Sequence, residues 1–151
     1  MQRYQWSSLN KQQVGAYAEY FVKMELTMYG FQVYETEVDD RGIDFIARLD
    51  NGPFLEVQVK SLRSPGYVFA HKEKFDLREN LLMAVALFSV GSPPALFLIP
   101  SFAWKEPNEL FVSRDYGGLK SKPEWGLNIS QRNMAALEKY RFEKIISHFF
   151  E

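Results

Sequence analysis

Hydrophobic positions near the start of the chain recur with the period of a helix. From Asn10 to Tyr29 the apolar side chains gather on one broad arc when successive residues are turned by about 100° each. Asn10 can cap this helix, and Gln13 stands three residues later in capping-box position. Gly30 is of the residue type that ends helices. The pattern predicts an amphipathic helix whose apolar arc consists of Val14, Tyr17, Ala18, Phe21, Val22, Met24, Leu26 and Met28.

Past Gly30 the pattern changes to three short runs that are typical of strands. The turn-forming segments 39–42 and 50–53 separate these runs. Because both turns are short, we expect the strands to form an antiparallel meander. The three runs are Phe31–Glu37, Ile43–Leu49 and Phe54–Ser61.

Two continuous apolar runs, Met83–Val90 and Ala95–Ile99, lie further along the chain and predict buried strands. Between the meander and these runs, Tyr67–Ala70 predicts a short strand and Phe75–Leu81 a helical turn. The remaining expected elements are a short helix at Ser101–Lys105, edge strands at Leu110–Val112 and Trp125–Ile129, and helices at 130–140 and Phe142–Phe150. This order predicts one α/β (α+β) domain with a mixed sheet over residues 1–151, with its core at about 10–100 and a C-terminal extension at about 101–151.

Composition narrows the class of protein. Hydrophobic residues make up 46% of the 151 residues and aromatic residues 16%, which argues against a disordered chain. The absence of cysteine excludes a disulfide framework, a thiolate zinc site and a cysteine nucleophile. A net charge of −1 lacks the overall basic character of proteins that coat nucleic acids.

No segment of the sequence has the character of a membrane span or a signal peptide. The longest apolar run, residues 81–88, is far shorter than the roughly 20 residues that cross a bilayer. The first residues also lack the apolar centre of a signal peptide. We therefore expect a cytoplasmic protein that does not contact membranes.

Candidate chemistry lies on the second and third predicted strands. Alternation places Gln58 and Lys60 on the same face of their strand. Asp44 opens an otherwise apolar strand, where an acid is costly unless it is paired or bound to a cation. A hairpin that turns at 50–53 would bring these three side chains together. An acid and an amide oxygen suit Mg²⁺, and a lysine beside them can activate water or hold a phosphate. The alternative is a solvated polar face of a half-buried strand.

In their order along the chain, three motifs resemble those of the PD-(D/E)xK nuclease superfamily. They are G-x-x-A-E at Gly15–Glu19, D-x-G-I-D at Asp40–Asp44 and Q-V-K at Gln58–Lys60. The details are similar to Mrr-type endonucleases, archaeal Holliday-junction resolvases and a group of uncharacterised bacterial nuclease-like domains. In that last group a strand like Ala95–Ser101 closes the sheet. Ile43 stands where the proline of the superfamily name would be. The resemblance implies a restriction endonuclease-like αβββαβ core in three layers, α/β/α.

The resemblance also implies roles for individual residues. Asp44 would be the central metal ligand, and Gln58 a second ligand where most members have an acid. Glu19 would complete the metal shell directly or through water, and Lys60 would position the attacking water or steady the phosphate. The implied cofactor is Mg²⁺, with Mn²⁺ as a substitute. Glu56 shares the face of Gln58 and could supply the missing charge, although it lies further along the strand.

Basic and aromatic residues follow the Q-V-K motif directly. Arg63, Lys72 and Lys74 could hold phosphates, or they could belong to an ordinary solvated surface. Tyr67 and Phe69 could stack on bases, although packing in the core is the alternative for both.

Taken together, these features predict a Mg²⁺-dependent phosphodiester hydrolase of endonuclease type that acts on DNA in a defence, repair or mobile-element context. RNA stays open as an alternative substrate, and a homodimer is a further expectation. The rival hypothesis is a catalytically weak or inactive nuclease-fold module that binds nucleic acid or a protein partner. The two differ in whether the Glu19 carboxylate converges with Asp44, Gln58 and Lys60.

Overall fold

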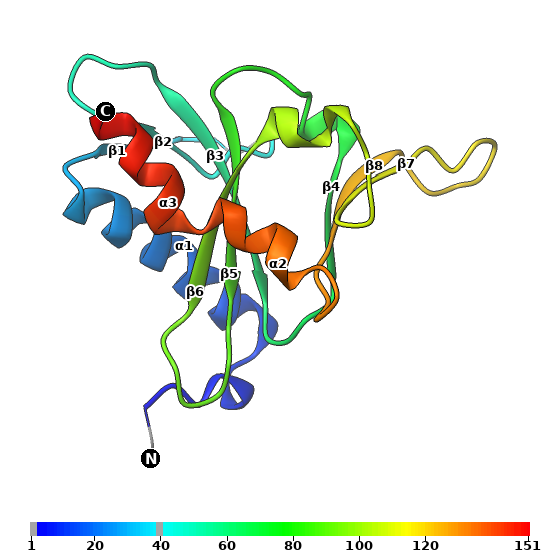
Figure 1. Cartoon of the computed structure of the whole chain (residues 1–151), viewed down its shortest axis with the longest axis horizontal. Coiled ribbons are helices and arrows are strands. Elements are labelled where there is room, and N and C mark those ends of the chain that lie inside the picture. Colours follow the sequence, from blue (N-terminus) through cyan, green and yellow to red (C-terminus); the bar gives the residue numbers. More distant parts are fainter. Residues whose placement is uncertain (1–2, 39–40) are drawn as a thin grey trace.

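The computed structural model describes residues 3–38 and 41–151, which form two sheets with helices around them (Figure 1). The larger sheet has five strands in the order β1-β2-β3-β5-β6. Only the β3–β5 pair is parallel, and the other three pairs are antiparallel. The strands are β1 (Gln32–Glu35), β2 (Phe45–Arg48), β3 (Leu55–Leu62), β5 (Leu81–Leu87) and β6 (Ala95–Pro100). The predicted antiparallel meander and mixed sheet are confirmed.

Helix α1 (Lys11–Met28) covers one face of this sheet. Its predicted capping box is present, because the Asn10 side chain accepts from the Gln13 backbone N–H at 2.8 Å and the Gln13 side chain accepts from the Asn10 N–H at 2.9 Å. Its buried residues are one to a turn, a spacing that places them on one stripe: Val14, Ala18, Val22 and Leu26. The predicted arc was too wide, because Met24 and Met28 lie on the exposed side of the helix.

A second sheet covers the opposite face of the larger sheet and lies to its right in Figure 1. Its three strands run in the order β4-β8-β7 and are all antiparallel. They are β4 (Tyr67–His71), β7 (Phe111–Arg114) and β8 (Glu124–Asn128). The predicted edge position of Trp125–Ile129 was wrong, because β8 is the central strand. The second sheet stands where the resemblance implied a helical layer.

Two short helical segments adjoin the strands of the second sheet. The helical turn predicted at Phe75–Leu81 is instead η2 (Lys72–Lys74), directly after β4. The predicted short helix at Ser101–Lys105 is confirmed as η3, and its buried Trp104 donates from Nε1 to the Gly126 carbonyl at 2.7 Å. This contact ties η3 to the middle strand of the second sheet.

The central strand β5 is buried on both faces, as its continuous apolar run predicts. Alternate residues pack toward α1 and toward the second sheet, so one strand supplies both halves of the core. Residues 63–80 connect β3 to its parallel neighbour β5 and carry β4 on the way. The connection therefore sets β4 opposite the polar face of β3.

The C-terminal helices lie near the predicted positions but are shorter. They are α2 (Met134–Leu137) with η4 (Glu138–Tyr140), and α3 (Phe142–Ser147) with η5 (His148–Phe150). Helix α3 packs on the same side of the sheet as α1, where Phe142 and Ile146 join the core. Within the described residues, no helix combines the length and apolar character needed to cross a membrane.

Candidate active site between the two sheets

Asp44 lies just before β2, at the point where the pairing of β2 with β3 begins. Its backbone N–H donates to the Val57 carbonyl at 2.9 Å, and its carboxylate Oδ2 accepts from the Val59 N–H at 2.7 Å. The carboxylate therefore continues the hydrogen bonding of the β2–β3 pair past the end of the strand. This arrangement fixes the acid beside the Q-V-K residues, as the hairpin predicts.

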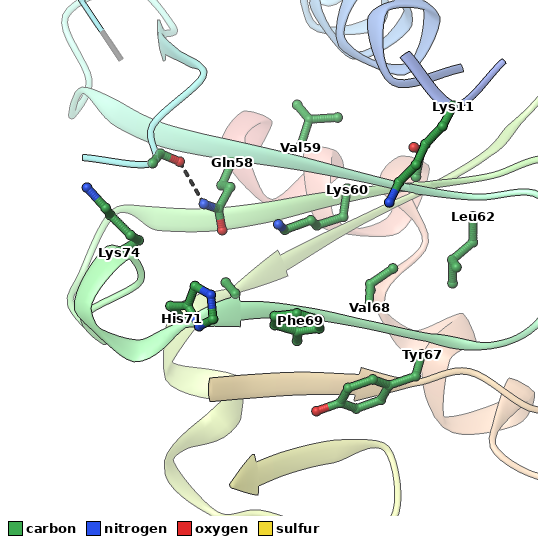
Figure 2. Close-up of a pocket in the computed structure, with 13 residues that line it drawn as sticks. Lys11, Gln58, Val59, Lys60, Leu62, Tyr67, Val68, Phe69, His71 and Lys74 are labelled. Carbon is green, nitrogen blue, oxygen red and sulfur yellow. Dashed lines mark hydrogen bonds between the residues drawn. The ribbon is translucent and has the colours of Figure 1, made fainter. Parts of the chain in front are cut away.

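Gln58 points from β3 into the space between the sheets and is only 8% exposed. Its Nε2 donates to the Gly42 carbonyl at 2.8 Å, which fixes the orientation of the amide (Figure 2). Its Oε1 is buried and accepts no hydrogen bond from the described part of the chain. A buried acceptor left unpaired costs about 1–3 kcal/mol, so it marks a place where a ligand can bind.

Gly42 is the residue that allows this close approach. Its φ is +77°, and an added Cβ would lie 2.9 Å from Gln58 Nε2 and 3.0 Å from Lys74 Cβ. Any side chain here would be strained by the backbone conformation and would push against Gln58. The structure thus explains the glycine of the D-x-G-I-D motif, whereas the first acid of that motif, Asp40, lies outside the described residues.

Lys60 extends from the same face of β3 as Gln58 (Figure 2). Burial lowers the pKa of the Lys60 ammonium below its ordinary value; the charge of Asp44 opposes this shift, and the nearby Lys11 adds to it. Lys60 is therefore half-buried, and burial changes its pKa more than the charge of the nearby Asp44 carboxylate does.

Gln58 and Lys60 line a cleft of about 630 Å³ between β3 and β4, whereas Asp44 is not among its lining residues. Three lysines (Lys11, Lys60 and Lys74) and His71 lie along it, and none of its lining residues in ranges 3–38 and 41–151 is acidic. The His71 Nδ1 is buried and makes no hydrogen bond to any described residue. Lys11 and His71 were not predicted from the sequence. The available signal for His71 was its alternation with Tyr67 and Phe69 on one strand.

Glu19 is not among the residues that line this cleft. Its carboxylate lies 3.0 Å from the Lys23 ammonium, which also contacts the Glu35 carboxylate at 2.5 Å. The structure thus brings Asp44, Gln58 and Lys60 together and leaves Glu19 in an ion pair on α1. Residues 3–38 and 41–151 contain no cluster of three or more histidine, cysteine or acidic residues that could hold a metal ion.

Glu56, the extra acidic candidate, is engaged elsewhere. Its carboxylate accepts from Arg78 Nε at 2.9 Å and forms an ion pair with the same guanidinium. The pair borders a separate pocket of about 560 Å³ that also contains Asp76 and Lys74. The negative charge of Glu56 is therefore balanced by Arg78 rather than directed into the cleft.

The three predicted phosphate-binding residues have different surroundings. Arg63 donates to the Leu9 carbonyl at 2.6 Å and thus anchors the segment before α1. Lys72 lies 2.7 Å from the Asp115 carboxylate and 4.0 Å above the ring of Trp125. Lys74 alone among the three lines the cleft.

Comparison with known proteins supports the fold. The sequence matches no family model and no curated protein. Two solved structures resemble it along most of their length. The Holliday junction resolvase Hjc of Archaeoglobus fulgidus is 12% identical, with a TM-score of 0.55 over 88% of this chain and 95% of Hjc. The bacterial homing endonuclease I-Ssp6803I is 16% identical, with a TM-score of 0.56 over 92% of this chain and 94% of that protein. The chain therefore has the restriction endonuclease-like fold of the PD-(D/E)xK nucleases.

Proposed function

We propose that this chain is a metal-dependent nuclease that hydrolyses phosphodiester bonds of DNA with Asp44, Gln58 and Lys60. The observation that carries the proposal is the buried Oε1 of Gln58, which accepts no hydrogen bond from residues 3–38 and 41–151 and lies in a cleft lined by lysines. Asp44 is held next to it by the hydrogen bond from the Val59 N–H. The fold adds support, because the similar solved structures are a Holliday junction resolvase and a homing endonuclease.

The donor atoms fit a hard divalent cation. Asp44 offers a carboxylate, and Gln58 an amide oxygen that the bond to Gly42 keeps in place. Mg²⁺ is commonly bound by one or two carboxylates, with waters and substrate phosphates as its other ligands. Asp44 and Gln58 would therefore hold Mg²⁺ or Mn²⁺ weakly without DNA. Glu19 stays a predicted third ligand, and its participation requires its carboxylate to leave Lys23.

The residues in and next to the cleft have separate roles in the proposed reaction. A divalent cation bound there would polarise the scissile phosphate and make a bound water more acidic. Lys60 orients the attacking water or holds an oxygen of the reacting phosphate, and Asp44 favours the charged form of this lysine. Lys11 and Lys74 can bind neighbouring phosphates, since the described lining residues include no acid that would repel them.

A cleavage assay tests this proposal. Supercoiled and linear DNA are incubated with Mg²⁺, Mn²⁺ or EDTA, and with wild type, Asp44→Asn, Lys60→Met or the control Lys120→Met. Lys120 is an exposed lysine of the β7–β8 loop outside the cleft. We expect Asp44→Asn and Lys60→Met to reduce the cleavage rate by about 100-fold or more, and the control to cleave like wild type. Equal cleavage by all four proteins would identify a contaminating nuclease and contradict the assignment.

The second candidate function is a DNA-binding module that does not cleave. The ion pair between Glu19 and Lys23 favours it, because this pair leaves Asp44, which is hydrogen-bonded to Val59 and acts on the charge of Lys60, as the main acidic ligand predicted for the metal. This function predicts metal-independent binding of DNA and no cleavage with either cation. Labelled RNA of the same sequence, added to both assays, tests the alternative substrate.

A further inference from the structure

The wall of the cleft opposite Lys60 is aromatic. Tyr67, Phe69 and His71 alternate along β4, so their side chains share one face of the strand. The ring centroids of Tyr67 and Phe69 are 6.1 Å apart with an angle of 24° between their planes, and the His71 ring lies 5.5 Å from Phe69. Phe69 is 41% exposed and lines the cleft. A large aromatic surface is thus open to a space that is otherwise rich in cations.

Several contacts hold this wall in place before any ligand arrives. The Tyr67 hydroxyl donates to the buried Glu124 carboxylate, and Arg114 lies 4.7 Å from the centre of the Tyr67 ring. The ring crosses Gly126 so closely that any Cβ there would collide with it. Burial, with the Glu124 carboxylate, raises the pKa of Tyr67, so the phenol stays neutral. These contacts hold the Tyr67 ring in place, with Phe69 next to it and His71 next to Phe69.

The polar atoms around the aromatic wall indicate the chemistry of its ligand. Within the described part of the chain, His71 Nδ1 and Gln58 Oε1 both lack partners although they are buried beside the cleft. Figure 2 shows Gln58 and Lys60 extending from β3 toward the side where β4 carries Phe69 and His71. A ligand that satisfies this arrangement has a flat apolar face, a polar edge for His71 and a nearby anion for Lys60. A nucleotide has all three properties.

The state of the base follows from the geometry of stacking. In a paired duplex both faces of a base are covered by its neighbours, so Phe69 can reach the face of a base only if that base is unpaired or extruded. An apolar protein segment is a poorer occupant, since it would bury Lys60 without a counter-charge. We infer that the β4 wall is a base-stacking subsite that takes an unpaired nucleobase of the DNA strand bound at Lys60. The inference rests on the proposed function in taking DNA as the ligand.

Direct binding measurements test the subsite without any cleavage. A short single strand carrying 2-aminopurine and the fully paired duplex of the same sequence are titrated in EDTA. Fluorescence anisotropy reports affinity, and quenching of the 2-aminopurine reports stacking. We expect wild type to quench the single strand, and Phe69→Leu to bind it about 10-fold more weakly without quenching. The affinity for the duplex should not change, and Phe69→Trp should restore both signals.

A matched control is available in η3. Phe102 is also 41% exposed but does not line the cleft, so Phe102→Leu should behave like wild type. The inference is overturned if Phe69→Leu binds the single strand as wild type does, or if it weakens single-strand and duplex binding equally. Thermal unfolding of each variant verifies folding, and failure of Phe69→Trp to recover quenching in a folded protein also counts against the subsite.

The outcomes separate this inference from the proposed nuclease. Phe69-dependent binding of the single strand by a protein that never cleaves DNA would support the subsite and contradict the hydrolytic function. Cleavage that depends on Lys60, with no effect of Phe69→Leu on gapped, single-stranded or paired DNA, would support the nuclease and contradict the subsite.

Discussion

The two walls of the cleft differ in how the fold supports them. The β3 wall carries Gln58 and Lys60 on a central strand, which pairs with β5 along residues 56–62 and with β2 along residues 55–57. The β4 wall carries Tyr67, Phe69 and His71 on an edge strand of a separate three-stranded sheet. The core of the fold therefore holds the groups proposed for hydrolysis, whereas an added sheet holds those proposed for base recognition. Substitutions that damage one wall should leave the other working.

The largest effect should come from Gly42→Ala, which breaks the β3 wall. The added methyl group would press on Gln58 Nε2 and the φ of +77° would strain the backbone. We expect a loss of about 2 kcal/mol in the free energy of unfolding and a cleavage rate as low as that of Lys60→Met. Chemical denaturation measures the stability, and cleavage of supercoiled DNA measures the rate. Gly66→Ala is the control, because a Cβ there meets only ordinary contacts at 3.8 Å. Equal stability of the two variants would contradict this account of the loop.

Tyr67→Phe should weaken the β4 wall by a smaller amount. The variant loses the hydroxyl that donates to Glu124, although Tyr116 still donates to this carboxylate at 2.9 Å. We expect about 1.5 kcal/mol less stability at neutral pH, with cleavage of paired DNA unchanged. Urea denaturation gives the stability, and the exposed Tyr20→Phe serves as control.

The same variant has a defined pH dependence. Burial and Glu124 raise the folded-state pKa of Tyr67 above the ordinary value of 10.0. The stability contributed by the neutral phenol is therefore complete below pH 10 and is lost as the pH rises above it. Tyr67→Phe has no such proton to lose, so the difference between wild type and variant should shrink above pH 10. A constant difference across this range would show that Tyr67 does not titrate as the contacts require.

Gln58→Glu should separate two roles of this side chain, which are binding a cation and holding the Gly42 loop through a hydrogen bond. The new carboxylate adds a negative charge for Mg²⁺ but replaces the donor to the Gly42 carbonyl with a second acceptor. We expect about 1 kcal/mol less stability in EDTA and a larger rise in melting temperature with added Mg²⁺ than in wild type. Thermal unfolding across a Mg²⁺ titration measures this response. If Mg²⁺ has the same effect on both proteins, Gln58 is not a ligand.

Lys60→Met should produce the smallest change in stability, and in the opposite direction. The lowered pKa of Lys60 shows that burial disfavours its charge more than Asp44 favours it. Removal of the cation should therefore raise the free energy of unfolding by about 0.5–1 kcal/mol at neutral pH while cleavage is lost. Urea denaturation without metal measures the gain, with Lys120→Met as the surface control. A loss of stability would mean that the Asp44–Lys60 attraction is the larger effect.

Features with a local origin could be predicted from the sequence. The α1 cap joins residues three apart, and the β2–β3 hairpin brings Asp44 to Gln58 and Lys60 through one short turn. The continuous apolar run of β5 is enough to predict that this strand is buried on both faces. Period, capping and turn length were sufficient in these cases, because each depends on neighbours in the chain.

Features that depend on distant pairing could not be predicted in the same way. Strand β4 pairs with β8, more than fifty residues later, and nothing local identifies that partner. The aromatic wall and the central position of β8 both follow from this pairing. Glu19 is a different case, since Lys23 stands four residues later and the ion pair was readable from helix geometry. The G-x-x-A-E motif favours a metal ligand at Glu19, whereas this spacing favours the ion pair that the structure contains.

The hydrogen bond from the Val59 N–H to Asp44 Oδ2 makes one backbone amide a sensor of the site. Most amides in β3 face another peptide group, whose charge never changes, but this one faces a carboxylate. Its proton resonance should therefore move when the charge on Asp44 is neutralised, whether by a cation or by acid. A single peak in a ¹⁵N-correlated spectrum would then record the arrival of Mg²⁺ or DNA in the native sequence, with no substitution and no attached label.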